Sequence, residues 1–140
     1  MLIHLEQITS VLDYGAGKGA LGQLLQDYDP ALSIQNYDPA VPDYADLPAR
    51  AALLICNDVL EHVEPEYLDA VLDHMTSLMG QVGFLVIALR KSNKRLPDGR
   101  NAHLIVADAD WWLERLGKRW AVERLPSRRD KELCVIVRPK

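Results

Sequence analysis

The sequence contains little cysteine and no long apolar run. Its two cysteines, Cys56 and Cys134, each lie within an apolar segment, and there is no second pair that could complete a zinc site. No uninterrupted apolar stretch approaches the roughly 20 residues that a membrane span requires. The N-terminus shows no export signal. We therefore expect two core thiols, no bound metal, no membrane association and a cytoplasmic location.

An excess of basic residues is also absent. The formal net charge is -4, which argues against the uniformly basic surface of many non-specific nucleic-acid binders but leaves room for a local basic patch. Charged residues make up 26% of the chain and are interspersed along it, which excludes disordered and fibrous classes. With 49% apolar residues, 140 residues suffice for one domain with a core but not for two. We expect a single domain over residues 1–140, without a separate substrate-recognition domain.

Strand-like and helical segments alternate along the chain. Helical periodicity predicts a helix that contains Leu21, Leu24 and Leu25, a second helix over about 63–78, and a third over 108–116 that Asp108 could cap. Apolar runs bounded by turn residues predict strands at 10–14, 32–37, 51–56, 84–89, 120–125 and 133–137. The stretch 40–50 has no amphipathic period and is predicted to be a loop.

This alternation predicts an α/β fold with a Rossmann-like, doubly wound sheet. Strands that alternate with helices form parallel sheets covered on both faces, and ligands bind beyond the carboxyl ends of the strands. The last two predicted strands are joined by the charged turn 126–131, which indicates an antiparallel hairpin at the C-terminus. The expected sheet is mostly parallel, has about six strands, and places the second strand at an edge.

A glycine-rich turn follows the first predicted strand, in the sequence Asp13-Tyr14-Gly15-Ala16-Gly17-Lys18-Gly19. Glycines at this spacing fit either a dinucleotide or S-adenosylmethionine (SAM), because both ligands approach the backbone of a tight turn. The carboxylate of Asp13 favours SAM, which carries an ammonium and a sulfonium, whereas it would repel a pyrophosphate. Asp38 lies 19 residues beyond Gly19 at a strand tip, where an acid can accept hydrogen bonds from ribose hydroxyls of either cofactor.

Two segments resemble class I SAM-dependent methyltransferases. Residues 11–19 resemble motif I of that family, and residues 54–63, Leu-Ile-Cys-Asn-Asp-Val-Leu-Glu-His-Val, resemble its later strand and the turn after it. Residues 96–105, Leu-Pro-Asp-Gly-Arg-Asn-Ala-His-Leu-Ile, are similar to segments of small stand-alone bacterial and phage methyltransferases. The resemblance covers about the first ninety residues well, and the terminal hairpin suits the reversed last strand of the family.

The resemblance assigns cofactor-binding roles by position. It implies that the methionine part of SAM contacts the glycine-rich turn and that the ribose contacts the tip of the second predicted strand. The adenosine or methyl-donor end would lie near the tip of the third predicted strand. The residues so assigned are Asp13, Gly15, Ala16 and Gly17 for the turn, Asp38 for the ribose, and Asn57 with Asp58 for the third position. Glu61 and His62 would lie at the rim that faces the methyl acceptor.

The sequence departs from the family between the second and third strands. Only 18 residues separate Asp38 from Asn57, too few for the usual helix, strand and adenine-contacting acidic loop. We expect this helix and strand to be missing or vestigial, and Asp46 with Leu47 to replace the adenine contact.

A basic loop over residues 90–103 follows the strand at 84–89. Because it leaves the carboxyl end of a strand, we expect it to overhang the site, where its five cations could read a phosphate or carboxylate on the acceptor. Asp98, Arg100 and Asn101 are its candidate acceptor contacts. The alternative is a solvated loop without a binding role.

Methyl transfer from a sulfonium mainly requires alignment and a dry site. A base is needed only where the acceptor must lose a proton, and His103 is the first candidate and His62 the second. The adjacent residues Trp111 and Trp112 are interpreted as packing residues rather than as a platform that stacks on the acceptor.

The methyl acceptor is not specified by a motif. The Asn/Asp-Pro-Pro-Tyr motif and the Pro-Cys pair are absent, which argues against DNA base methylation. A small molecule, such as a sugar, a nucleotide or another phosphorylated metabolite, is the leading hypothesis, while an RNA or protein acceptor remains open. Two other functions also remain: a non-catalytic SAM-binding regulatory or partner subunit, and a nicotinamide-dependent oxidoreductase, which Asp13 disfavours.

Overall fold

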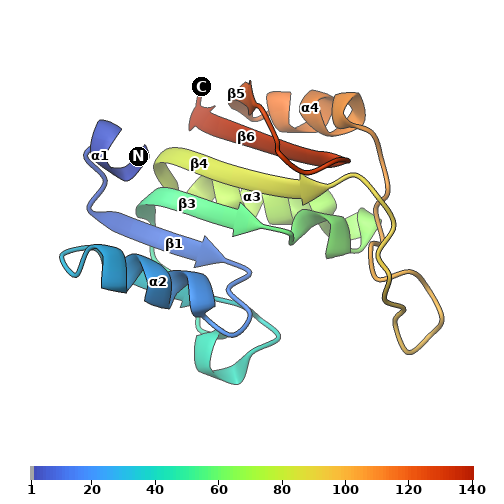
Figure 1. The fold of residues 1–140 in the computed structure, drawn as a ribbon, viewed down its shortest axis with the longest axis horizontal. Coiled ribbons are helices and arrows are strands. Elements are labelled where there is room, and N and C mark those ends of the chain that lie inside the picture. The colour runs from blue at the N-terminus through green and yellow to red at the C-terminus, as the bar shows by residue number, and fades with distance from the viewer. Residues whose placement is uncertain (1) are drawn as a thin grey trace.

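A six-stranded sheet with the strand order β2-β1-β3-β4-β6-β5 runs through the computed structural model, which describes residues 2–140 (Figure 1). Strands β1 to β4 are parallel, and β6 is antiparallel to both β4 and β5. The strands are β1 (Ser10–Tyr14), β2 (Ser33–Tyr37), β3 (Ala51–Asn57), β4 (Met79–Ala88), β5 (Trp120–Leu125) and β6 (Glu132–Pro139). The expected α/β sheet, its edge strand β2 and its C-terminal hairpin are confirmed.

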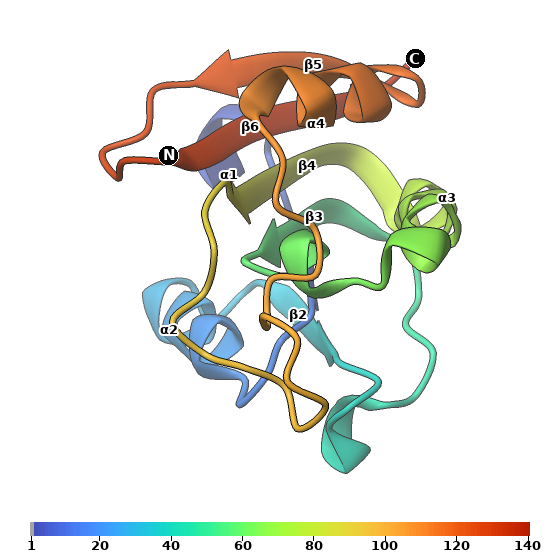
Figure 2. The same cartoon turned by 90° about the vertical axis from the view of Figure 1, so that its right-hand side faces the viewer.

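Helices cover both faces of this sheet. Figure 2 looks onto the carboxyl ends of the parallel strands, with α2 on one side of the sheet and α3 on the other. The α-helices are α1 (Leu2–Leu5), α2 (Ala20–Tyr28), α3 (Leu68–Leu78) and α4 (Ala109–Gly117), and the 3-10 turns are η1 (Pro42–Tyr44), η2 (Leu60–His62) and η3 (Pro65–Tyr67). Within residues 2–140, none of these helices is long and apolar enough to cross a membrane.

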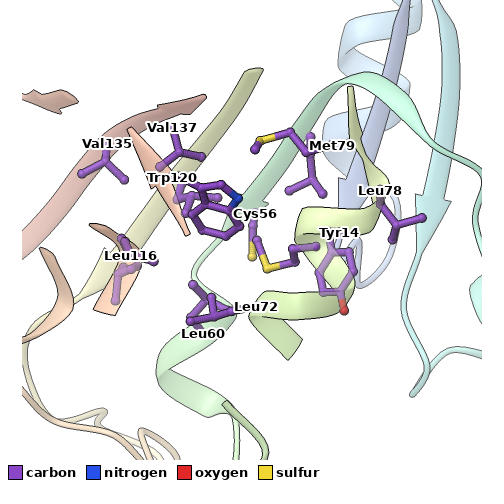
Figure 3. Close-up of a cluster of buried hydrophobic side chains, with 14 of the residues drawn as sticks. Tyr14, Cys56, Leu60, Leu72, Leu78, Met79, Leu116, Trp120, Val135 and Val137 are labelled. Carbon is purple, nitrogen blue, oxygen red and sulfur yellow. The ribbon is translucent and has the colours of Figure 1, made fainter. Parts of the chain in front are cut away.

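The larger core lies on the sheet face that α3 and α4 cover. Figure 3 shows Leu72 of α3, Leu116 of α4 and Trp120 of β5 gathered with Val135 and Val137 of β6. These side chains, like Trp112, are almost fully buried. Trp112 is thus a packing residue, as expected, while the half-buried Trp111 holds the Arg115 guanidinium 3.5 Å above its ring.

A smaller core lies on the opposite face, beneath α1 and α2. Leu21 and Leu25 of α2 pack there against β1 and β3, but Leu24 is 67% exposed. The apolar face of α2 therefore includes Leu21 and Leu25 but not Leu24, which was predicted to belong to it. Cys56 is buried, as expected, and burial raises the pKa of its thiol, whereas Cys134 is only partly buried on β6.

Two element boundaries differ from the sequence prediction. The helix expected from residue 63 begins at Leu68, because the chain first makes the two 3-10 turns η2 and η3 around Pro65, which lacks an N–H to donate. Strand β4 begins at Met79 rather than at residue 84. Its first residues include Gly80 and Gly83, so they do not form the apolar run by which a buried strand is recognised.

No α-helix or strand lies between β2 and β3 in the described chain, which confirms the expected gap after Asp38. Aromatic rings pack beside β1 and β2 on the α3 face. The Tyr14 hydroxyl lies 2.8 Å from His74 Nδ1, and the Tyr14 and Tyr37 ring centroids are 5.1 Å apart. Tyr14, Tyr37 and His74 thus cover the α3 face of the sheet next to its edge strand β2.

Alanine at Gly83 should destabilise the fold, whereas alanine at Gly117 should not. A Cβ at Gly83, in β4, would lie 2.7 Å from Val137 Cγ2 and 2.8 Å from Met79 Sδ. Overpacking of this kind costs about 1–3 kcal/mol. A Cβ at Gly117, in α4, would meet nothing within 4 Å, and alanine is the better helix former by up to about 1 kcal/mol. In urea unfolding, the midpoint of Gly83→Ala should lie below that of the wild type and the midpoint of Gly117→Ala should not. Equal midpoints for the two variants would contradict the close packing at Gly83.

Candidate functional site

The glycine turn after β1 lies where the carboxyl ends of β1, β2 and β3 meet (Figure 2). Gly15 and Gly17 have φ values of 86° and 55°, which L side chains rarely adopt. The N–H groups of Gly15 and Ala16 donate to Tyr37 O at 2.7 and 3.0 Å. These bonds fix the turn to the end of β2, so the predicted turn residues form one rigid edge of the site.

A cavity of about 400 Å³ lies beside this turn. Asp38 and Asp58 line it with carboxylates, and Pro39, Val59 and Val71 line it with apolar surface. A pocket with a mainly apolar lining and a few polar groups is typical of small-ligand sites. The cavity therefore offers an apolar wall and two acidic residues to a ligand.

Asp38 connects the end of β2 to the glycine turn. Its Oδ2 accepts the N–H of Gly17 at 2.9 Å, and its Oδ1 accepts the N–H of Ala40 at 3.0 Å. An ionised carboxylate has about four acceptor positions. Each oxygen of Asp38 can therefore accept one more hydrogen bond from a ligand hydroxyl in the cavity.

Asp13 is a buried acid at the end of β1, with 4% of its surface exposed. Burial, with a smaller contribution from the negative charge of Asp38, raises the pKa of Asp13 to about 6. The carboxylate remains the major form at neutral pH, in a place where it is poorly solvated. A cation bound at the turn would offset this cost, whereas an anionic pyrophosphate would increase it.

The residues present fit SAM. A Cβ built on Gly17 would meet nothing within 4 Å, so the backbone of the turn faces open space that a ligand can occupy. The SAM ammonium requires a nearby carboxylate, its ribose requires an acceptor, and its adenine requires an apolar slot. Asp13, Asp38 and the Pro39–Val59 side of the cavity supply these three features.

Of the remaining predicted cofactor residues, one lines the cavity and the others do not. Asp58 lines the cavity with a φ of 55°, and its N–H donates to Val86 O at 2.9 Å, whereas Asn57 is exposed at the tip of β3. Asp46 and Leu47 are exposed and do not line the cavity, so the structure does not support the hypothesis that they replace the adenine contact.

Three titratable side chains meet next to this cavity. His62 is exposed and lines the cavity, while His103 is 8% exposed, and their ring centroids are 4.8 Å apart. Glu61 is fully buried, and burial raises the pKa of its carboxyl group. The two candidate bases thus lie together, but it is His62, the second candidate, that faces the cavity.

The comparisons with known proteins agree with this geometry. Residues 4–136 match a family model described as a methyltransferase domain. The chain belongs to this family. The methyltransferase matches none of the curated proteins with which it was compared.

Solved methyltransferase structures share its fold at low sequence identity. DhpI in a complex with SAH has a TM-score of 0.70 and 18% identity over 99% of this chain and 81% of its own. The 1,6-didemethyltoxoflavin-N1-methyltransferase of Burkholderia thailandensis has a TM-score of 0.68 and 20% identity, and the match covers 99% of this chain and 74% of that protein. Human N-acetylserotonin methyltransferase in complex with SAM has a TM-score of 0.68 and 14% identity. The match covers 96% of this chain and 48% of that protein, so the chain spans about half of it.

Ion pairs and hydrogen bonds hold the basic loop of the methyltransferase. Arg100 pairs with Glu64, Nη2 to Oε1 at 2.8 Å, and with Asp98, Nε to Oδ2 at 2.8 Å. These contacts raise the pKa of Arg100 and lower those of both acids. Asn101 Oδ1 accepts from the N–H groups of Ser92 and His103, each at 3.0 Å.

Asp98, Arg100 and Asn101 therefore hold the shape of the loop, and none of the three lines the cavity. Their role as acceptor contacts stays a prediction. Their pairing also brings the loop back over η2, where His103 reaches Glu61.

Sequence reasoning missed the apolar wall of the cavity, which Pro39, Val63 and Val71 contribute. Pro39 follows the ribose acid directly, so its position could have indicated the role. Val63 and Val71 lie within the segment predicted as a helix over about 63–78, and no local pattern separates a buried valine from one that lines a ligand cavity.

Proposed function

We propose that this methyltransferase transfers the methyl group of SAM to a small-molecule acceptor. SAM is its cofactor, and when bound it supplies a methyl group on a positively charged sulfur that leaves as a thioether. The observation that carries the proposal is the buried Asp13 carboxylate beside the open glycine turn, with Asp38 at the cavity next to it.

The chain's own residues supply binding and orientation. We infer that Asp13 holds the ammonium of the cofactor, Asp38 its ribose hydroxyls, and Pro39 with Val59 its adenine. Gly15, Ala16 and Gly17 let the methionine part contact the backbone, and Asn57 and Asp58 complete the site from β3. Fixed groups of this kind align the methyl donor with the acceptor and exclude water.

The acceptor side is formed by η2 and the basic loop. A small acceptor is supported by one structural relative, whose structure holds 1,6-didemethyltoxoflavin together with S-adenosylhomocysteine. Arg90, Lys91, Lys94 and Arg95 form no ion pair among residues 2–140. These cations favour an acceptor that carries a phosphate or carboxylate.

His62 is the residue placed to take a proton from a hydroxyl or protonated amine. Its Nδ1 lies 2.9 Å from Ala102 O, and because a carbonyl can only accept, Nδ1 must carry the proton. The lone pair is then on Nε2. His103 has the same arrangement, with Nδ1 donating to Arg90 O.

Asp38→Ala should weaken SAM binding by about 10-fold to 100-fold, the value of losing hydrogen bonds to a charged group. Titration calorimetry with SAM would measure this loss, with Asp43→Ala, an exposed acid of η1, as the matched control. Formation of S-adenosylhomocysteine from SAM, with a small-molecule extract as the acceptor source, tests catalysis. Equal affinity of the wild type and Asp38→Ala would exclude the proposed site, and turnover only with the macromolecular fraction would exclude a small acceptor.

A further inference from the structure

Glu61, His62 and His103 converge although they come from distant parts of the sequence. Glu61 and His62 lie on η2, and His103 lies at the end of the basic loop. Each offers one potential ligand atom, and these three atoms lie within 4.8 Å of one another. The backbone also connects the two segments, because the N–H of Ile105 donates to Glu61 O at 3.1 Å.

Glu61 contributes a carboxylate oxygen that has no partner. The side chain is 0% exposed, and its Oε1 accepts the N–H of Ala88 at 3.2 Å. Its Oε2 is buried and has no hydrogen-bond partner among the described residues. A buried polar atom without a partner is costly and rare in native proteins, and a bound cation would remove this cost.

The two histidines are prepared in the manner of metal ligands. Nδ1 of His62 donates to Ala102 O, and Nδ1 of His103 donates to Arg90 O. Each neutral ring therefore has its lone pair on Nε2. Metal-binding histidines almost always donate their other ring N–H to a carbonyl, a carboxylate or water, which fixes the tautomer and the ring orientation.

We propose that Glu61, His62 and His103 bind a divalent transition-metal ion such as Zn²⁺. Two imidazoles and one carboxylate are a known donor set for catalytic zinc and for iron(II), and they do not suit Mg²⁺, which prefers oxygen ligands alone. With bonds of about 2.1 Å, tetrahedral ligand atoms lie about 3.4 Å apart. The three potential ligand atoms lie within 4.8 Å of one another, so a small approach of the exposed His62 side chain would bring them to this spacing.

This site would leave coordination positions open on the side of the cavity. Three protein ligands do not fill a four-coordinate or five-coordinate ion, and His62 lines the cavity directly. If the proposed function holds, an acceptor hydroxyl that binds the ion would release its proton to water more easily, and the resulting oxyanion would take the methyl group. Both Nε2 lone pairs would then bind the metal, so His62 would be a ligand rather than the base.

Metal binding can be measured without SAM or an acceptor. The purified chain is first treated with a chelator and dialysed, and Co²⁺ is then titrated while its visible absorption is recorded. We expect one Co²⁺ per chain, displaced by Zn²⁺, with binding at least about tenfold weaker in His62→Gln. His4→Gln is the matched control, because His4 is an exposed histidine of α1 outside the cluster.

The imidazole nitrogen NMR signals test the same site without any substitution. The chain has only four histidines, His4, His62, His74 and His103, so their signals can be assigned individually. Zn²⁺ should shift Nε2 of His62 and His103 and leave the other two rings unchanged. Shifts only at His4 or His74, or equal Co²⁺ affinity in the wild type and His62→Gln, would overturn the metal site. Either result would leave the SAM site untouched, because neither measurement involves SAM.

Discussion

Gly15→Ala is expected to weaken SAM binding by at least about tenfold. The residue has a φ of 86°, and a Cβ there would lie 2.3 Å from Cγ2 of Val59. Val59 lines the cavity, so either the turn must move or Val59 must shift into the space of the ligand. Overpacking costs about 1–3 kcal/mol, and 1.4 kcal/mol corresponds to a tenfold change in affinity. Titration calorimetry with SAM would measure the loss, with circular dichroism to verify folding.

Two further variants separate the collision from backbone strain. Gly99→Ala introduces a side chain at a similar φ of 89°, but a Cβ there would meet nothing within 4 Å. It should leave SAM affinity unchanged. Val59→Ala in the Gly15→Ala background removes the two colliding methyl groups and should restore part of the affinity. If Gly15→Ala binds as tightly as the wild type, the turn does not form this wall of the site.

The order of elements could be predicted because each signal is local. The apolar run at β3 and the helical spacing of Leu21 and Leu25 depend only on neighbouring residues, and the alternation of such elements specifies a doubly wound sheet. The starts of α3 and β4 were wrong by about five residues because tertiary packing decides them. Gly83, for example, pairs with Val137 of the antiparallel β6, which lies 54 residues further along the chain.

In the candidate site, too, residues with a local sequence pattern could be predicted and residues with distant partners could not. Asp13, Gly15 and Asp38 were predicted because the turn and the strand tip each carry their own pattern. The role of Arg100 could not be predicted, since its partner Glu64 lies 36 positions away and nothing local indicates that pairing. The proposed metal ligands were not predicted for a similar reason, because His103 lies near Glu61 only through the path of the basic loop. Cysteine spacing, on which the expectation of no metal relied, has no bearing on a cluster of histidine and glutamate.

Below pH 6, SAM affinity should fall by up to about tenfold per pH unit. Burial raises the pKa of Asp13 to about 6, so acidification converts the carboxylate into a neutral acid that cannot pair with the ammonium. Above about pH 7 the affinity should be constant. Calorimetry across this range would measure the profile, and a flat profile would show that Asp13 does not hold the cation.

Asp13→Asn keeps the shape of the side chain and removes its charge. It should weaken SAM binding at pH 7.5 by about 10-fold to 100-fold and should abolish the pH dependence below pH 6. The same change should stabilise the ligand-free protein. Because the folded-state pKa of Asp13 lies above its unfolded value, the folded wild type binds this proton more tightly, and the stability that protonation gives is lost as pH rises through about 6.

At pH 7.5 the wild type therefore carries the cost of a buried charge, of the order of 1–3 kcal/mol, which Asp13→Asn avoids. Urea unfolding without SAM should show the variant to be more stable at pH 7.5 and the difference to shrink toward pH 5. Opposite signs for stability and cofactor affinity at a single residue would identify Asp13 as an acid retained for binding a cation rather than for folding.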